Sequence, residues 1–162
     1  MRCLAVLALV SACGSSESRP PPEAKAAPKP PDQMDEKMRH CPLALDGATS
    51  TLEDIDGGVR FTIQAPDGEV DEARRRAHHI VDFAAKRTKD GHSGFDGKGG
   101  GRMKNCPVVT DGVSISASDI AGGARLEITS TVDQVEQLRT ETRSRSEKFP
   151  FVGATIKIAA HP

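Results

Sequence analysis

The sequence of 162 residues contains no tryptophan, no tyrosine and only five phenylalanines. This lack argues against carbohydrate binding and against single-stranded nucleic-acid binding, because both use stacking on aromatic side chains. The chain also has no excess of either charge, with 22 basic and 23 acidic residues. No strong field therefore attracts it to nucleic acid or to an anionic membrane surface. No apolar run reaches the length needed to cross a bilayer.

The N-terminus has the pattern of an export signal. Arg2 precedes the short apolar run "CLAVLALVSA", which ends on "VSAC", residues 10–13. This ending resembles the lipobox of bacterial lipoproteins, in which an aliphatic residue and two small residues precede a cysteine that is lipidated. The resemblance implies a signal peptide over residues 1–12 and an acylated Cys13, with palmitate among the expected chains, at the head of the mature protein. The alternative is an ordinary cleaved signal peptide.

Several acyl chains anchor a protein stably where one does not, so we expect membrane attachment through the N-terminal lipid. Gly14 is not the aspartate that retains many such lipoproteins in the inner membrane. The resemblance therefore favours the outer membrane of a bacterial envelope, with the protein facing the periplasm. Residues 14–33 are rich in proline, serine and alanine, and they indicate a disordered tether over residues 13–37.

The rest of the chain, residues 38–162, contains a duplication. Residues 38–64 and 103–129 align at a fixed offset of 65, and eleven of the 27 pairs are identical. "MRHCP" and "MKNCP" open the two copies. Two copies are too few for a solenoid, so they predict one pseudo-symmetric domain. We place the repeats at 38–88 and 103–149, with a glycine-rich loop at 89–102 between them and a final strand at 153–160.

Each repeat predicts a β-hairpin followed by a helix. Apolar and polar residues alternate over 48–53 and 59–63, and again over 113–118 and 124–128. The paired glycines between these strands, Gly57-Gly58 and Gly122-Gly123, predict type I′ turns.

The predicted helices follow the hairpins. A buried stripe over residues 70–84 predicts the first helix, and a capping box of Thr131 and Gln134 predicts the start of the second. The fold class is therefore α+β, with two tandem ββα repeats, a final strand, and a mostly antiparallel sheet that carries both helices on one face. From its second strand the order is βαββαβ, so a ferredoxin-like arrangement is one alternative, and the strand order stays open.

The cysteines suggest a cross-link between the repeats. Cys3 leaves with the signal peptide and Cys13 is alkylated, which leaves Cys41 and Cys106 as the two thiols of an oxidising compartment. We predict that they form a disulfide. Two separately buried thiols and a copper- or zinc-thiolate pair are the alternatives.

The sequence offers two weak sites. A metal site for copper or zinc would draw on five side chains that hold imidazole, thioether or thiolate groups: His78, His79, His92, Met103 and Cys106. Adjacent histidines on a helix point about 100° apart, which weighs against this site. Two pairs of arginines at the offset of 65 could contact an anion symmetrically, although copied surface residues explain them as well: Arg60, Arg125, Arg74 and Arg139.

No combination of nucleophile, base and orienting group is visible, so we expect no enzymatic activity and no cofactor. The leading hypothesis is a membrane-tethered periplasmic interaction or structural lipoprotein that binds an envelope protein. The alternative is a metal-binding envelope lipoprotein. The duplicated domain also resembles bacterial lipoproteins whose activity is uncharacterised, and that resemblance implies no activity.

Overall fold

The computed structural model describes residues 36–89, 106–149 and 153–160. In these ranges the elements follow in this order: η2 (Glu36–His40), β1 (Thr49–Ile55), β2 (Gly58–Gln64), α1 (Val70–Lys89), β3 (Ser114–Ile120), β4 (Gly123–Thr129), η4 (Val132–Gln134), α2 (Val135–Glu147) and β5 (Thr155–Ile158). The predicted α+β class is confirmed. No helix in this part of the chain is long and apolar enough to span a membrane.

Several predicted features lie outside the described residues. They are the signal peptide at 1–12, the lipidated Cys13, most of the tether at 13–37 and most of the glycine-rich loop at 89–102. Only the last two residues of the predicted tether are described, and they begin η2.

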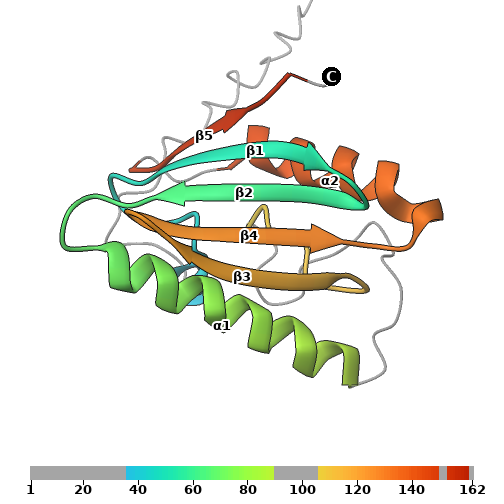
Figure 1. Ribbon diagram of the computed structural model, residues 1–162, viewed down its shortest axis with the longest axis horizontal. Coiled ribbons are helices and arrows are strands. Elements are labelled where there is room, and N and C mark those ends of the chain that lie inside the picture. The colour runs from blue at the N-terminus through green and yellow to red at the C-terminus, as the bar shows by residue number, and fades with distance from the viewer. Residues whose placement is uncertain (1–35, 90–105, 150–152, 161–162) are drawn as a thin grey trace, which may run out of the picture.

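The five strands form one sheet in the order β3-β4-β2-β1-β5 (Figure 1). Three neighbouring pairs are antiparallel, and only β5 runs parallel to its neighbour β1. From β2 onward the chain follows the βαββαβ order of ferredoxin-like folds. However, β1 is inserted between β2 and β5, so the ferredoxin-like alternative does not describe the whole sheet.

A pseudo-two-fold axis relates the two repeats. In the central pair of strands, Phe61 lies opposite Leu126, which is its own counterpart at the offset of 65. The hairpins share one register as well, since Leu52 pairs with Phe61 just as Ala117 pairs with Leu126. The axis therefore passes through the sheet between the middles of β2 and β4, and it exchanges β1 with β3.

Each helix packs on strands of the other repeat. Helix α1 contacts β3 and β4, whereas α2 contacts β2 and β5. Figure 1 shows α1 along the β3 side of the sheet and α2 behind the β1–β2 hairpin. The stripe that α1 buries is the predicted one, with Ala73, Ala77 and Ile80 fully buried. The repeats are thus interlocked and do not form two separate ββα units.

The segments that lead into the repeats fill the core between the helices. Leu43, Val108 and Val109 are fully buried there, in the same cluster as Phe61 and Leu126. Cys41 and Cys106 form the predicted disulfide, with 5.9 Å between their Cα atoms. Because the two cysteines are counterparts, a direct bond between them places the disulfide near the pseudo-two-fold axis.

The hairpin turns differ from the prediction. Ile55 pairs with Gly58, so the two turn residues of the first hairpin are Asp56 and Gly57. Ile120 pairs with Gly123, so those of the second are Ala121 and Gly122. Gly57 and Gly122 have positive φ angles. Among the described residues no non-glycine residue has a positive φ, so the first turn residues, Asp56 and Ala121, do not. A type I′ turn needs positive φ at both central positions, so that assignment was wrong.

The second glycine of each pair meets a different requirement. A Cβ atom on Gly58 would lie 1.9 Å from the carbonyl oxygen of Ile128, and one on Gly123 would lie 2.0 Å from that of Ile63. These glycines permit the close approach of the two central strands.

The start of the second helix was also predicted incorrectly. Neither Thr131 nor Gln134 makes a side-chain cap hydrogen bond, so the capping box is not formed. The chain instead passes through η4, where the backbone N–H of Gln134 donates to the carbonyl of Thr131 at 2.9 Å. The helix α2 then begins at Val135 and ends at Glu147, before Pro150.

Candidate functional site

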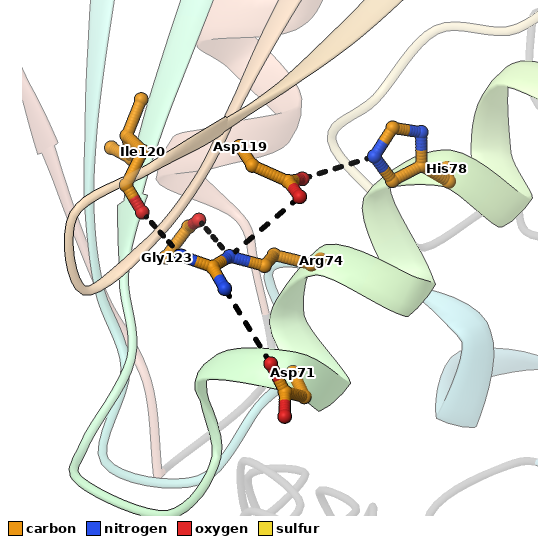
Figure 2. A network of polar contacts seen from close by, with 6 residues as sticks. All are labelled: Asp71, Arg74, His78, Asp119, Ile120 and Gly123. Atoms are coloured by element: carbon orange, nitrogen blue, oxygen red, sulfur yellow. Dashed lines mark hydrogen bonds and ion pairs between the residues drawn. The ribbon is translucent and has the colours of Figure 1, made fainter.

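An arginine from each helix holds the hairpin turn of the other repeat. Arg74 of α1 donates from Nη2 to the carbonyl of Ile120 at 2.9 Å and from Nε to that of Gly123 at 3.2 Å (Figure 2). Its counterpart Arg139 of α2 donates to the carbonyls of Ile55 and Gly58 at 2.7 and 3.3 Å. The second arginine pair that the repeats share therefore stabilises the interlocked fold.

Each of these arginines has an acidic neighbour three residues earlier on its helix. Arg74 lies 3.5 Å from Asp71, and Arg139 lies 2.5 Å from Glu136. Both acids are largely exposed, so these pairs contribute little to stability.

Beside each arginine, an aspartate near the end of a strand meets a side chain of the facing helix. Asp119 of β3 accepts from Nε2 of His78 at 3.0 Å and lies 3.9 Å from Nε of Arg74 (Figure 2). We call Arg74, His78 and Asp119 the β3-edge cluster. At the counterpart positions Asp54 of β1 pairs with Arg143 of α2, at 2.8 Å.

The two aspartates differ sharply in exposure. The side chain of Asp54 is only 4% exposed, whereas that of Asp119 is 53% exposed. Strand β5 pairs with β1 from Thr49 to Leu52, and the chain just after it reaches Arg143, the partner of Asp54. Arg143 donates from Nη1 to the carbonyl of Ala159, just after β5, at 3.2 Å. In the described residues no strand takes the corresponding place beside β3.

The β3-edge cluster contains a carboxylate that orients an imidazole, which is one part of a hydrolytic triad. Ser118 is the nearest hydroxyl along the chain, but it precedes Asp119 in β3 and so points to the opposite face of the sheet. The arrangement can hold a hydrogen-bonding group presented at the edge of the sheet. No residue of β3 places a nucleophile next to the imidazole of His78.

The other shared arginines lie on the face of the sheet that is opposite the helices. Arg60 bonds Glu127 from Nε at 2.9 Å and from Nη2 at 2.7 Å, and it lies 3.5 Å from Glu53. The hydrogen bond to Glu127 is the main reason why the pKa of Arg60 is raised. Arg125 lies opposite Thr62 and Ser118, which occupy the positions that correspond to these two glutamates.

Arg125 is therefore the arginine of this set that is left without an acidic partner. Within the described ranges it forms no ion pair, and its Nε atom is buried without a hydrogen-bond acceptor. The predicted anion contact is thus divided among different roles. Arg74 and Arg139 hold turns, Arg60 is neutralised by glutamates, and Arg125 has no ion-pair partner in the described part of the chain.

The residues of the predicted metal site have separate partners. Cys106 is bonded to Cys41, so it has no thiolate to offer. His78 contacts Asp119, while the ring of His79 lies against that of His40 with 4.8 Å between the centroids. His92 and Met103 lie outside the described residues. Elsewhere in the described chain, no group of three or more histidine, cysteine, aspartate or glutamate residues is placed to hold a metal ion.

Sequence reasoning missed the pairing of the aspartates. Asp54 and Asp119 lie near the ends of β1 and β3, and each contacts a side chain of the facing helix. The offset of 65 contains a signal, because it aligns His78 with Arg143 as two side chains able to donate to those aspartates. The contact of His40 with His79 had no such signal. Burial of His79 lowers its pKa, and the charge of His40 adds to this effect.

Comparisons of the chain with models of protein families, with curated proteins and with solved structures find no match. The interpretation of these clusters therefore rests on their geometry and on the internal repeat.

Proposed function

We propose that this protein is a non-enzymatic interaction module that is exported, lipid-anchored through Cys13 and exposed to the periplasm of a bacterial envelope. The disulfide between Cys41 and Cys106 is the observation that carries the proposal. Thiols of cytosolic proteins are kept reduced, whereas structural disulfides persist in exported proteins. The buried disulfide therefore supports the export that the N-terminal "VSAC" predicts.

The polar groups of the domain support binding over catalysis. Arg74 and Arg139 are engaged with backbone carbonyls, and Arg60 and Arg143 are engaged with carboxylates. Such groups stabilise the fold and are not free to take part in a reaction. His78 and Asp119 are more than half exposed at the edge of β3, where another chain can reach them.

Fractionation of a Cys13→Ser variant tests the anchoring. In a detergent phase separation we expect the wild-type protein in the detergent phase, because acyl chains partition with the detergent. The Cys13→Ser variant should move to the aqueous phase or remain unprocessed. Cys3→Ser is the matched control, since it removes a cysteine of the same leader and should behave as the wild type does. Equal partitioning of wild type and Cys13→Ser would show that the lipoprotein interpretation is wrong.

A further inference from the structure

The pseudo-two-fold symmetry of the sheet is broken at its edges. Strand β1 carries β5 on its outer side, in parallel, with Thr49 opposite Thr155 and Leu52 opposite Ile158. Strand β3 is the counterpart of β1, yet no strand among the described residues pairs with its outer side (Figure 1). One edge of the sheet is thus extended by a strand, and at the other edge no described strand takes the equivalent position.

The backbone of β3 offers the groups that β1 uses to hold β5. The N–H of Thr155 donates to the carbonyl of Ala48 at 3.0 Å, and the N–H of Ala159 donates to that of Leu52 at 2.9 Å. The counterparts of these acceptors are the carbonyls of Val113 and Ala117. Natural sheets protect such an edge with proline, lysine or a bulge. Strand β3, "SISASDI", has neither proline nor lysine, and its seven residues pair with β4 without interruption.

The β3-edge cluster matches the polar contact that fastens β5. Arg143 links the carboxylate of Asp54 to the carbonyl of Ala159, the residue that follows the parallel strand β5. His78 stands at the position of Arg143 and bonds Asp119 (Figure 2). Both side chains are more than half exposed, at 56% and 53%. An imidazole oriented by a carboxylate is therefore presented where a strand carbonyl would lie.

We propose that an extended segment of a partner protein adds to the sheet beside β3 and runs parallel to it. The segment resembles β5 in chemistry, with apolar side chains on alternate positions and polar ones between them. Its apolar residues face the half-buried Ile115 and Ala117 on the helix side, and its backbone bonds the open groups of β3. This inference rests on the proposed function and names the kind of partner that the module binds.

Segments of this chain fit the position poorly. Residues 90–95, "DGHSGF", follow α1 as the segment containing β5 follows α2, but they lack apolar alternation and contain two glycines. The tether at 14–33 is rich in proline, which has no N–H for a sheet. A second copy that pairs through β3 about a two-fold axis normal to the sheet would run antiparallel, unlike the parallel arrangement at β1.

A synthetic peptide with the sequence of residues 153–160 is the probe, since the molecule itself uses that segment as a parallel strand. The full chain, in detergent, is titrated with this peptide while amide chemical shifts are recorded. We expect binding at peptide concentrations up to about 1 mM, with shifts at residues 113–119 and at His78. Amides of β1 should not shift, because its edge is occupied by β5. A peptide of the same composition with its apolar residues placed side by side should not bind.

Two variants locate the site. The N–H of Ala117 points toward the open edge, as that of its counterpart Leu52 points toward β5, so Ala117→Pro removes an edge donor and spares the bonds to β4. We expect Ala117→Pro to weaken peptide binding about tenfold or more, since a backbone hydrogen bond and its neighbours are lost. His78→Ala should weaken it several-fold, whereas His79→Ala, which changes the adjacent histidine, should not.

The melting temperature of each variant shows that it is folded, and a folded His78→Ala keeps the test valid if Ala117→Pro fails to fold. Absence of binding, shifts confined to other elements, or affinities that neither variant changes would overturn the proposal. So would sedimentation as a dimer that Ala117→Pro dissociates, because the occupant would then be a second copy. The detergent partitioning of the Cys13→Ser variant is a separate measurement. If the peptide does not bind, the proposed lipid anchoring is therefore unaffected.

Discussion

Removing the disulfide between Cys41 and Cys106 should lower the free energy of unfolding by about 4 kcal/mol. The bond joins residues that are 65 positions apart, so it closes a long loop in the unfolded chain. In the chain-entropy model, a loop of this length restricts the unfolded state by that amount. Domains of this size are stable by only about 5–15 kcal/mol, so the loss is a large part of the total.

Two perturbations separate the cross-link from the packing of its atoms. Reduction of the wild-type protein breaks the bond but keeps both sulfur atoms in the core, where Cys41 and Cys106 are fully buried. The double variant Cys41→Ala/Cys106→Ala also removes the sulfur atoms, so it should be less stable than the reduced protein. The order oxidised, reduced, double variant is therefore expected in urea unfolding.

Far-UV circular dichroism is the suitable signal, because the chain has no tryptophan or tyrosine whose fluorescence would report unfolding. The expected shift of the urea midpoint follows from the change in free energy divided by the slope of the transition. Coincident unfolding curves for oxidised and reduced protein would refute the loop-closure reasoning. A double variant as stable as the oxidised protein would refute it too.

Three further predictions concern single side chains. Gly58→Val and Gly123→Val should each destabilise the fold by about 1–3 kcal/mol in thermal melts, because the new side chain meets a carbonyl of the neighbouring central strand; melts that move by less than a degree would contradict this. Arg139→Ala should cost about 1–3 kcal/mol through two lost bonds to carbonyls, whereas Glu136→Gln, at an exposed neighbour, should cost far less. Hydrogen bonds from Arg75 and Arg76 lower the pKa of Glu72 from 4.5 to about 2, so its ionised form stabilises the fold above about pH 4.5 and loses that effect as pH falls through about 2. The difference in melting temperature between wild type and Glu72→Gln should vanish over that range, and a difference that is independent of pH would contradict it.

The duplication made much of the fold predictable from the sequence. The offset of 65 identified the two repeats, and the alternation of apolar residues placed β1, β2, β3 and β4 to within about two residues. The same offset suggested that Cys41 and Cys106 could meet near an axis. Local patterns of this kind are written in consecutive residues, so one sequence is enough to read them.

The arrangement of the elements could not be predicted in the same way. That α1 packs on β3 and β4, and α2 on β2 and β5, depends on contacts between residues far apart in the chain. The parallel pairing of β5 with β1 is also long-range, and it joins the end of the described chain to the first strand. The turns were misassigned because Gly57 and Gly58 look alike in a sequence, although the first supplies a positive φ and the second a close approach between strands.

Comparison of the two repeats separates residues that maintain the fold from residues open to a function. The identical pairs include those that act between the repeats: the arginines that hold the turns, the turn glycines and the bonded cysteines. The pairs that differ lie where the surroundings differ, and the clearest is His78 against Arg143. Arg143 is bound to the buried Asp54, whereas His78 and Asp119 are more than half exposed at the edge of β3. Since symmetry alone would give both sites the same residue, this difference points to the edge of β3 as the place where the two halves of the molecule have taken different roles.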